Sequence, residues 1–170
     1  IYAYQIIEAI KIAKEKGLNL PIVYNSNGYE SVEILRKLEG YIDVYLPDLK
    51  YYYEELGKRL SGINNYFENA TIAIKEMYNQ VGNPVYDENG LMKKGLLIRH
   101  LVLPNHIRNS KMVLKWIKEN IDSQVPVSVM AQYFPTNKAM QEQDINRKLT
   151  QEEYQEIEQY VYELDLNGYM

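Results

Sequence analysis

Segments with apolar residues at helical spacing alternate along the chain with short apolar runs. The first helical segment covers residues 1–16 and ends before Gly17, a residue typical of helix C-termini. The last opens on Thr150, whose spacing to Glu153 forms a capping box. The same spacing predicts further helices at residues 32–38, 54–60 and 69–81, and one that Asn109 or Ser110 would cap.

The short apolar runs predict β-strands at residues 20–24, 42–46, 96–103 and 125–130. Strands that alternate with helices form βα units, and strands that are apolar throughout are buried on both faces of a parallel sheet. The turn sequence at residues 87–90 predicts the tip of a hairpin or loop. Without an internal repeat or a low-complexity linker, residues 1–170 are predicted to form one α/β domain.

The composition excludes several kinds of site and partner. The chain has 170 residues and no cysteine, which rules out a disulfide scaffold, a zinc ribbon, a cysteine nucleophile and an iron–sulfur cluster bound by this chain itself. Its net charge of −4 argues against nucleic acid and against an anionic membrane. With no long apolar span and no signal peptide pattern, we expect a cytoplasmic protein. The helical pattern already present at Ile1 indicates a segment of a longer polypeptide.

Polar residues gather where the predicted strands end. In open α/β sheets and in barrels, ligands bind beyond the carboxyl ends of the strands. Those ends carry amides, a carboxylate, cations and hydroxyls, on Asn25, Ser26, Asn27, Asp48, Lys50, Arg99, Gln132 and Tyr133. The glycine-rich phosphate loops of nucleotide-binding folds are absent from the sequence. The sequence therefore predicts a ligand site at this edge of the sheet that is not of the Rossmann type.

Several of these residues also have a purely structural explanation. Residues 25–28, Asn-Ser-Asn-Gly, are a typical turn sequence. Asp48 and Lys50 are two apart on an extended chain, so they lie on the same face and can pair with each other. Arg99 lies within an apolar strand, where a buried guanidinium needs a partner. For Arg99 we favour a position that faces a lumen or a ligand.

The two histidines carry weaker signals. His100 would point away from its neighbour Arg99, and we expect a packing histidine with satisfied hydrogen bonds. His106 follows the strand in a loop, and we expect it to be exposed to solvent. Two histidines without carboxylates at matching spacing predict no metal site.

Four strand-end motifs together resemble a known family. They are Tyr24-Asn25-Ser26-Asn27-Gly28-Tyr29-Glu30, Asp43-Val44-Tyr45-Leu46-Pro47-Asp48-Leu49-Lys50-Tyr51, Arg99-His100-Leu101-Val102-Leu103-Pro104 and Met130-Ala131-Gln132-Tyr133-Phe134-Pro135. In this order and spacing, which cover nearly the whole chain, they resemble the radical S-adenosylmethionine proteins of the pyruvate formate-lyase activating enzyme-like family. Each motif alone is weak, so the resemblance rests on their succession.

The resemblance implies a (β/α)6 partial TIM barrel, of which residues 1–170 would be the C-terminal four βα units. The family's N-terminal strands and its Cys-x-x-x-Cys-x-x-Cys loop would lie outside this chain. In the family that loop binds a [4Fe–4S] cluster, which cleaves S-adenosylmethionine to a 5′-deoxyadenosyl radical that acts on a glycyl-radical-type partner. An electron donor for the cluster and a protein substrate are therefore implied partners. Without the cluster ligands, we expect the chain alone to be inactive.

The resemblance also assigns roles to residues. Residues 25–27 match the family's strand-end Asp-Thr-Asn-Gly, which lies beside the methionine and ribose portions of S-adenosylmethionine. Asp48 and Lys50 match its Asp-x-Lys near the sulfonium and become the candidate catalytic pair. Arg99 matches the arginine of its Arg-x-x-x-x-Pro strand.

Two departures from the family pattern affect these roles. Asn25 stands where the family has an acid, which puts a cation site there in doubt. The segment with Gln132 and Tyr133 lacks the family's histidine, so these two residues would contact the nucleoside in a different way.

A second class of function stays open, a non-catalytic α/β binding or interaction module with a tyrosine-rich rim. The chain has 17 Tyr against 2 Phe, and tyrosine is enriched at protein interfaces. Residues 51–53, three consecutive tyrosines, are the clearest cluster, although a general composition bias would also explain it. A barrel fragment leaves strand edges unpaired, so self-association is a further expectation. A three-cysteine motif upstream of Ile1 would favour the enzyme over the module.

Overall fold

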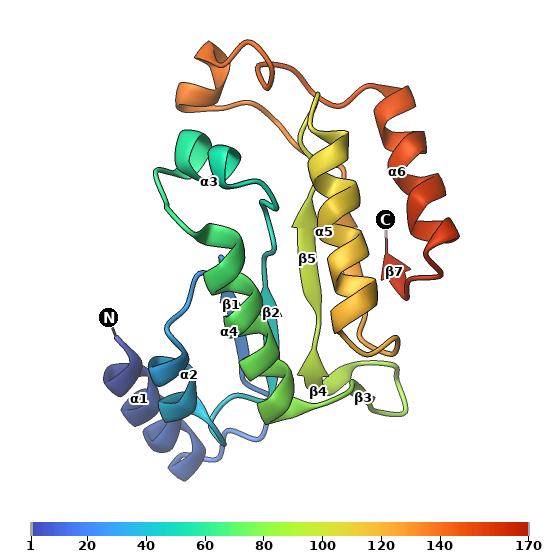
Figure 1. Cartoon of the computed structure of the whole chain (residues 1–170). Helices are drawn as coiled ribbons and strands as arrows, with labels where there is room; N and C mark the ends of the chain where they lie inside the picture. The colour runs from blue at the N-terminus through green and yellow to red at the C-terminus, as the bar shows by residue number, and fades with distance from the viewer. Residues whose placement is uncertain (1, 170) are drawn as a thin grey trace.

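Strands lie side by side in an open sheet, and helices cover one of its faces (Figure 1). The computed structural model describes residues 2–169. The helices are α1 (Ala3–Glu15), α2 (Val32–Leu38), α3 (Glu54–Ser61), α4 (Tyr66–Val81), α5 (Ile107–Asn120), the 3-10 helix η1 (Asn137–Gln141) and α6 (Gln151–Glu163). The strands are β1 (Val23–Ser26), β2 (Val44–Pro47), β3 (Val85–Tyr86), β4 (Met92–Leu96), β5 (Ile98–Leu101), β6 (Val127–Met130) and β7 (Gly168–Tyr169).

The strands follow one another in the order β1-β2-β4-β3 and β5-β6-β7. Only Leu97 separates β4 from β5, and both run parallel to the β2 segment: Leu97 N donates to Tyr45 O at 3.0 Å, and Leu49 N donates to Arg99 O at 2.8 Å. β3 is antiparallel to β4. The alternation of strands and helices is confirmed, but the sheet is mixed and does not close, so the expectation of a purely parallel sheet is wrong.

The antiparallel pair comes from the turn sequence at residues 87–90. The Asp87 carboxylate accepts hydrogen bonds from the backbone N–H groups of Asn89 and Leu91, both at 2.9 Å, which closes a tight turn between β3 and β4. The expected hairpin tip is therefore present. It lengthens the third predicted strand at its N-terminal end and adds an antiparallel strand to the sheet.

Several element boundaries differ from the sequence expectation. The first strand begins at Val23 instead of residue 20, because Pro21 has no N–H and Ile22 N donates to the Asp43 carboxylate at 2.7 Å. Helix α5 begins at Ile107 after His106, so neither Asn109 nor Ser110 caps it. Both lie inside the helix and are buried. Their side chains bond to the segment after β2 and to β5, a tertiary role that the local sequence does not reveal.

Side chains from the sheet and from α2, α4, α5 and α6 form one hydrophobic core. Leu35 of α2, Ile74 of α4, Leu114 of α5 and Ile157 of α6 are fully buried in it. The capping box predicted at the start of α6 is confirmed, with both reciprocal hydrogen bonds between Thr150 and its N3 glutamate present. The core thus lies between the sheet and the helices on one of its faces.

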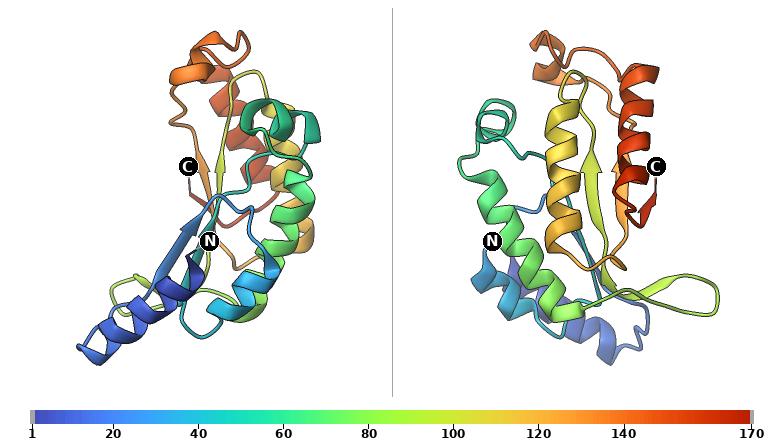
Figure 2. Two further views of the ribbon diagram at one scale, coloured as in Figure 1. Left: turned by 90° about the vertical axis from the view of Figure 1, so that its left-hand side faces the viewer. Right: turned by 45° about the vertical axis from the view of Figure 1, so that its right-hand side comes forward.

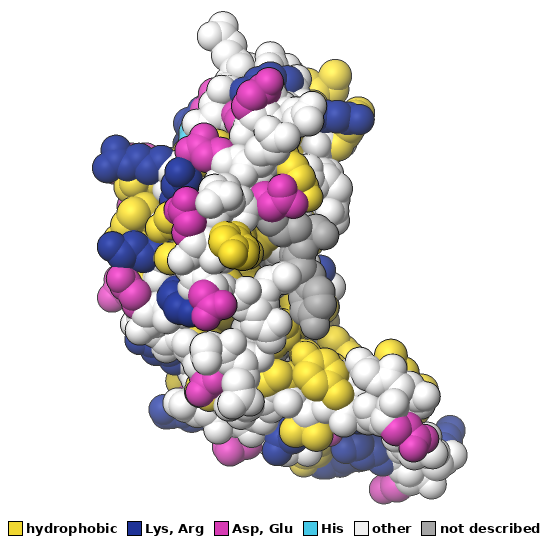
Figure 3. Space-filling model, turned by 90° about the vertical axis from the view of Figure 1, so that its right-hand side faces the viewer, with side chains coloured by type: hydrophobic (Ala, Val, Ile, Leu, Met, Phe, Trp, Pro, Cys, Tyr) yellow, Lys and Arg dark blue, Asp and Glu magenta, His cyan; other side chains and the backbone are white. Residues whose placement is uncertain are grey.

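The opposite face of the sheet is not covered by helices, as the side view in Figure 2 shows. Along β6, Val127 and Val129 are buried while Ser128 and Met130 are only half-buried, so one face packs and the other is open. Figure 3 shows that the molecule is hollowed along one side, where apolar side chains come to the surface. None of the helices within residues 2–169 has the length and apolarity needed to cross a bilayer.

Candidate functional site

Four predicted residues meet at the carboxyl ends of three strands. Arg99 of β5 contacts Asp48 Oδ1 through Nε at 2.8 Å and through Nη2 at 2.6 Å, and its Nη2 also donates to Asn25 Oδ1 at 2.8 Å. Lys50 Nζ lies 3.4 Å from Asp48 Oδ2. We call Asn25, Asp48, Lys50 and Arg99 the strand-end cluster. Its ionic side chains are only partly buried, with exposed fractions of 14% for Asp48, 25% for Arg99 and 33% for Lys50.

The strand-end cluster combines both explanations given for its members. Arg99 has the carboxylate partner that its position requires, and Asp48 also pairs with Lys50. Asp48 carries one negative charge against the two positive charges of Arg99 and Lys50, so the cluster keeps a surplus of one positive charge. The cluster can therefore receive an acceptor or an anion at the Lys50 side without losing the Asp48–Arg99 pair.

Ser26 and Asn27 serve the turn that follows β1. Ser26 Oγ accepts from Gly28 N at 3.1 Å, and Asn27 Oδ1 accepts from Tyr29 N at 3.0 Å. Gly28 has φ +80°, and a Cβ at this position would lie 2.1 Å from the Asp48 carbonyl oxygen. The turn therefore contacts the end of β2 closely enough to require glycine, which places residues 25–28 beside the strand-end cluster.

Tyr66 joins these two strand ends from α4. Its hydroxyl lies 2.9 Å from the carbonyl oxygens of both Asn27 and Asp48 and accepts from Lys50 N at 3.0 Å. Tyr66 is 1% exposed, and burial raises the pKa of its hydroxyl well above the ordinary value. The hydroxyl therefore stays protonated and fixes the backbone that carries Asp48 and Lys50.

Two residues of α5 and one of β5 fix the backbone of residues 49–52, which follow β2. Asn109 Oδ1 accepts from Tyr52 N at 2.8 Å, while its Nδ2 donates to Lys50 O at 3.0 Å. His100 Nδ1 lies 2.7 Å from the Leu49 carbonyl oxygen, which can only accept, so Nδ1 carries the proton and the Ser110 hydroxyl donates to Nε2 at 2.8 Å. Burial lowers the pKa of His100 to about 4. His100 is thus the satisfied packing histidine that the sequence predicts.

Gln132 and Tyr133 follow β6 in a long loop, residues 131–149, that crosses the strand ends. Gln132 is exposed and makes no hydrogen bond within residues 2–168. Tyr133 is half-buried and donates its hydroxyl to the Ile145 carbonyl oxygen at 2.9 Å. Tyr133 and Lys50 line the same cavity, of about 310 Å³, between α3, the end of β5 and this loop. Tyr133 is therefore placed near the strand-end cluster, whereas no hydrogen bond links Gln132 to it.

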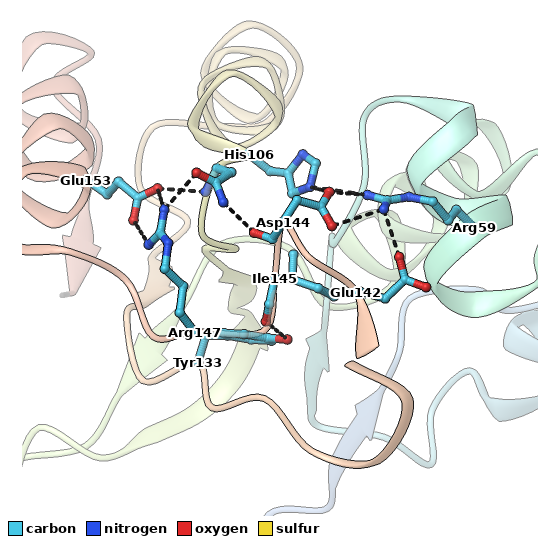
Figure 4. Close-up of polar contacts among 9 residues, drawn as sticks. Arg59, His106, Tyr133, Glu142, Asp144, Ile145, Arg147 and Glu153 are labelled. Carbon is cyan, nitrogen blue, oxygen red and sulfur yellow. Dashed lines mark hydrogen bonds and ion pairs between the residues drawn. The ribbon is translucent and has the colours of Figure 1, made fainter. Parts of the chain in front are cut away.

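Two groups of ion pairs hold loop 131–149 in place (Figure 4). Arg59 of α3 contacts Glu142 at 2.9 Å and Asp144 at 2.5 Å. Arg147 contacts Glu153 of α6 at 2.7 Å. The Arg59 guanidinium, helped by the His106 imidazole, holds the pKa of the Asp144 carboxyl well below its usual range. The loop is thus anchored to α3 on one side and to α6 on the other.

His106 differs from its expected exposure. Its Nε2 lies 2.8 Å from Asp144 Oδ2, and only 18% of its side chain is exposed. The expectation of a solvent-exposed loop histidine is wrong because the partner, Asp144, comes 38 residues later in the chain. No group of three or more metal-ligating side chains occurs in the part of the chain that the structure describes.

Comparisons with known proteins find a solved structure with a similar fold and a curated relative with a similar sequence. A domain of a pyruvate-formate lyase-activating enzyme from Bacteroides vulgatus matches it with a TM-score of 0.68, over 99% of this chain and 90% of that domain, at 12% sequence identity. The two chains therefore share a fold. An uncharacterized protein from Methanocaldococcus jannaschii is 37% identical over 169 residues, which are 95% of this chain but 44% of that protein. The chain thus spans less than half the length of this curated relative. No protein-family model matches the chain.

The sequence gives little sign of the residues that support the site. Tyr66 and Asn109 lie on helices, and their polar atoms are directed at backbone far away in sequence, so no local motif marks them. Glu30 is a half-buried carboxylate next to the turn after β1, and burial raises its pKa while the hydroxyls of Ser26 and Tyr24 oppose this rise. The one available signal for Glu30 is its position directly after the strand-end turn. Gly28 could have been found from the Asn-Gly pair, which favours positive φ.

Proposed function

We propose that this chain is the cofactor-facing part of a radical S-adenosylmethionine enzyme. The observation that carries the proposal is the strand-end cluster, which brings Asp48, Lys50, Arg99 and Asn25 together from separate strands. It lies where α/β folds bind ligands, in a fold that is similar to a domain of a pyruvate-formate lyase-activating enzyme. Radical S-adenosylmethionine chemistry is the activity that fits both the strand-end cluster and this fold best.

The donor set of the strand-end cluster fits S-adenosylmethionine. The Lys50 ammonium complements the carboxylate of the methionine portion, and the Asp48 carboxylate holds that ammonium in place. Arg99 holds Asp48 in place, while Asn25 offers an amide to hydroxyl groups of the ribose. In the proposed roles, Asp48 and Lys50 are the catalytic pair and Asn25, Ser26, Asn27 and Arg99 bind the cofactor.

The nucleoside end would contact Gln132 and Tyr133. Because the Tyr133 hydroxyl already donates to the Ile145 carbonyl, Tyr133 offers its ring face for stacking rather than a hydrogen bond. The Gln132 amide has no partner within residues 2–168 and can bond to a base edge. This division of roles replaces the histidine that is absent from this segment.

The donor set does not fit a [4Fe–4S] cluster. Such clusters need cysteine thiolates, and the chain has no cysteine. The iron ligands would therefore come from polypeptide outside these 170 residues, in a protein as long as the M. jannaschii relative. S-adenosylmethionine and the cluster together supply one-electron chemistry. This chain's residues would orient the cofactor, and we expect the chain alone to be inactive.

The partners of the whole protein follow from the same proposal. A glycyl-radical-type protein substrate and an electron donor for the cluster are the partners that such an enzyme needs. The alternative of a binding module with a tyrosine-rich rim gains no support from residues 51–53. Tyr51 is 8% exposed and packs against Tyr66, while Tyr52 packs against Phe67, so the triplet contributes largely to packing.

Equilibrium binding of S-adenosylmethionine to the full-length protein tests the proposal. Lys50→Met removes the ammonium but keeps the aliphatic stem, and we expect it to weaken binding by about tenfold or more, the value of a charge-assisted hydrogen bond. Lys37→Met is the matched control, because Lys37 is also ion-paired and its side chain is 35% exposed against 33% for Lys50. Equal binding by wild type and the Lys50 variant, or no binding by wild type, would contradict the proposal.

A further inference from the structure

The cavity beside Lys50 has a mostly apolar wall. It has a volume of about 310 Å³ and lies between α3, the end of β5 and loop 131–149. Leu60, Leu101, Leu103, Ala139 and Ile145 supply the apolar surface. This volume is at the small end of the range for small-molecule sites, roughly 300–1,000 Å³. The wall therefore suits a compact molecule with an apolar body.

Most polar groups of this wall already have partners. The Tyr51 hydroxyl bonds to a serine of α3 at 2.9 Å, and the Tyr133 hydroxyl donates to a backbone carbonyl of the loop at 2.9 Å. Arg59 contacts both Glu142 and Asp144, as Figure 4 shows. Glu142, the one carboxylate of the wall, is therefore already engaged in an ion pair. These groups shape the cavity, and they leave few donors free for a ligand.

Two ammonium groups of the wall keep free donor capacity. Lys50 Nζ is 3.4 Å from Asp48 Oδ2, and the same carboxylate is contacted at 2.6 Å by Arg99. An ammonium has three N–H donors, so this single long contact leaves Lys50 largely unsatisfied. Lys138 has no hydrogen bond or ion pair within residues 2–168. The unused hydrogen-bonding capacity at the cavity is thus cationic, and it calls for an anionic acceptor.

We infer that this cavity binds a small organic carboxylate with an apolar body. The carboxylate would lie against Lys50, with Lys138 at the opening, and the apolar body would lie against Leu101, Leu103 and Ile145. Lys50 and Lys138 supply the positive charge that a carboxylate needs, and the apolar wall suits its organic body. The inference deepens the proposed function and rests on it to this extent: the cavity would hold a small ligand beside the cofactor, and the three N–H donors of Lys50 would serve this ligand, the cofactor and Asp48.

The cavity is held open before any ligand binds. Its roof, loop 131–149, is anchored by Arg59 on one side and by Arg147 on the other. Tyr133 and Ile145, which both line the cavity, are joined to each other by a hydrogen bond across the loop. A preformed site avoids the cost of ordering a loop on binding, so even a small ligand can bind measurably.

Isothermal titration of the full-length protein with phenylacetate and phenylacetamide tests the inference. The two probes have nearly the same shape, and only phenylacetate carries the charge. We expect phenylacetate to bind about tenfold more tightly or better, since only it makes a charge-assisted bond to Lys50. Lys50→Met should remove most of this difference, and Lys138→Met a smaller part because Lys138 is exposed. Lys148→Met is the matched control, an exposed lysine of the same loop that does not line the cavity.

Each result decides the matter in one direction. A preference for phenylacetate that is lost in Lys50→Met and kept in Lys148→Met supports the site. Equal binding of the two probes, no binding of phenylacetate, or an unchanged preference in Lys50→Met overturns it. S-adenosylmethionine binding is measured on the same preparations. A protein that binds phenylacetate but not S-adenosylmethionine contradicts the proposed function alone, and the reverse contradicts the cavity alone.

Discussion

A buried imidazole connects the end of β2 to α5. His100 donates to the Leu49 carbonyl and accepts from Ser110, and this arrangement requires the neutral ring with its proton on Nδ1. Protonation would place a second N–H against the serine and a charge in a site with no solvent contact, since His100 is 0% exposed. The segment that carries Asp48 and Lys50 therefore depends on a neutral histidine.

The free energy of unfolding should fall as the pH drops from about 6.5 to about 4. The folded state holds the pKa of His100 at about 4, whereas the unfolded chain has the ordinary value of about 6.5. The unfolded state thus binds a proton first, and up to about 3 kcal/mol of stability is lost across this window. Urea unfolding at several pH values measures the effect. His100→Gln should flatten the slope between pH 6.5 and 4.5, and the same slope in both proteins would contradict the account.

Two carboxyls titrate in a lower window and do not confuse this measurement. Ion pairing with Arg59 and with Arg147 lowers the pKa values of Asp144 and Glu153. Their stabilising contributions are present above the ordinary carboxyl pKa values, roughly 4, and are lost only as the pH falls further.

Gly28 should not accept a side chain. Its φ is +80°, and a Cβ would lie 2.1 Å from the Asp48 carbonyl oxygen, which is backbone and cannot move away cheaply. We expect Gly28→Ala to cost roughly 2–5 kcal/mol in urea unfolding. Gly40→Ala is the control, because Gly40 has φ +78° and no heavy atom within 4 Å of the added Cβ, and should cost only about 1 kcal/mol. Similar costs at the two positions would show that the contact with Asp48 is unimportant.

Among the elements, α4 fixes the strand ends through one hydroxyl. Tyr66→Phe leaves the Lys50 N–H and the carbonyls of Asn27 and Asp48 without their partner, and should cost about 1–3 kcal/mol. Amide hydrogen exchange at Lys50 should become faster in this variant. Tyr45→Phe is the control: this tyrosine is equally buried, and its hydroxyl donates to Gln80 on another face. Unchanged exchange at Lys50 in the Tyr66 variant would contradict the role given to Tyr66.

The sequence predicted elements well where the signal is local. The Thr150 capping box and the turn at residues 87–90 are set by side chains two to four residues from their partners, and both are found. The predicted start of α5 is wrong because the Asn109 side chain bonds to Tyr52, 57 residues away, instead of capping the helix. An asparagine side chain can either cap a helix or bond to a distant segment, and the local sequence is the same in both cases. Only the fold shows which of the two roles Asn109 has.

The candidate site follows the same division. Asp48, Arg99 and Asn25 could be predicted because the ends of neighbouring strands must meet at one edge of a sheet. The ion pair that anchors loop 131–149 could not be predicted, because Arg59 and Asp144 lie 85 residues apart and no periodic pattern relates them. The predicted exposure of His106 is wrong for the same reason, since its partner Asp144 lies 38 residues away in the chain.

At the scale of the whole molecule, one face of the sheet is not covered by helices, and β1 forms an edge of the sheet. Val23, on this edge strand, is 54% exposed, and the described strands pair with β1 on one side only. Such an edge can add another strand, so the expected self-association stays a prediction for the isolated chain. The M. jannaschii relative is more than twice as long as its matched part, and the iron ligands that we propose would lie outside these 170 residues.

The formation of 5′-deoxyadenosine from S-adenosylmethionine tests the central claim most directly. The full-length protein is reconstituted with iron and sulfide without oxygen and given a chemical reductant, and the product is measured for wild type, Asp48→Asn and Lys37→Met. We predict product from wild type and from Lys37→Met, and a rate lower by about tenfold or more in Asp48→Asn, which cannot form the charged contacts of the strand-end cluster. No product from wild type, or an undiminished rate in Asp48→Asn, would contradict it.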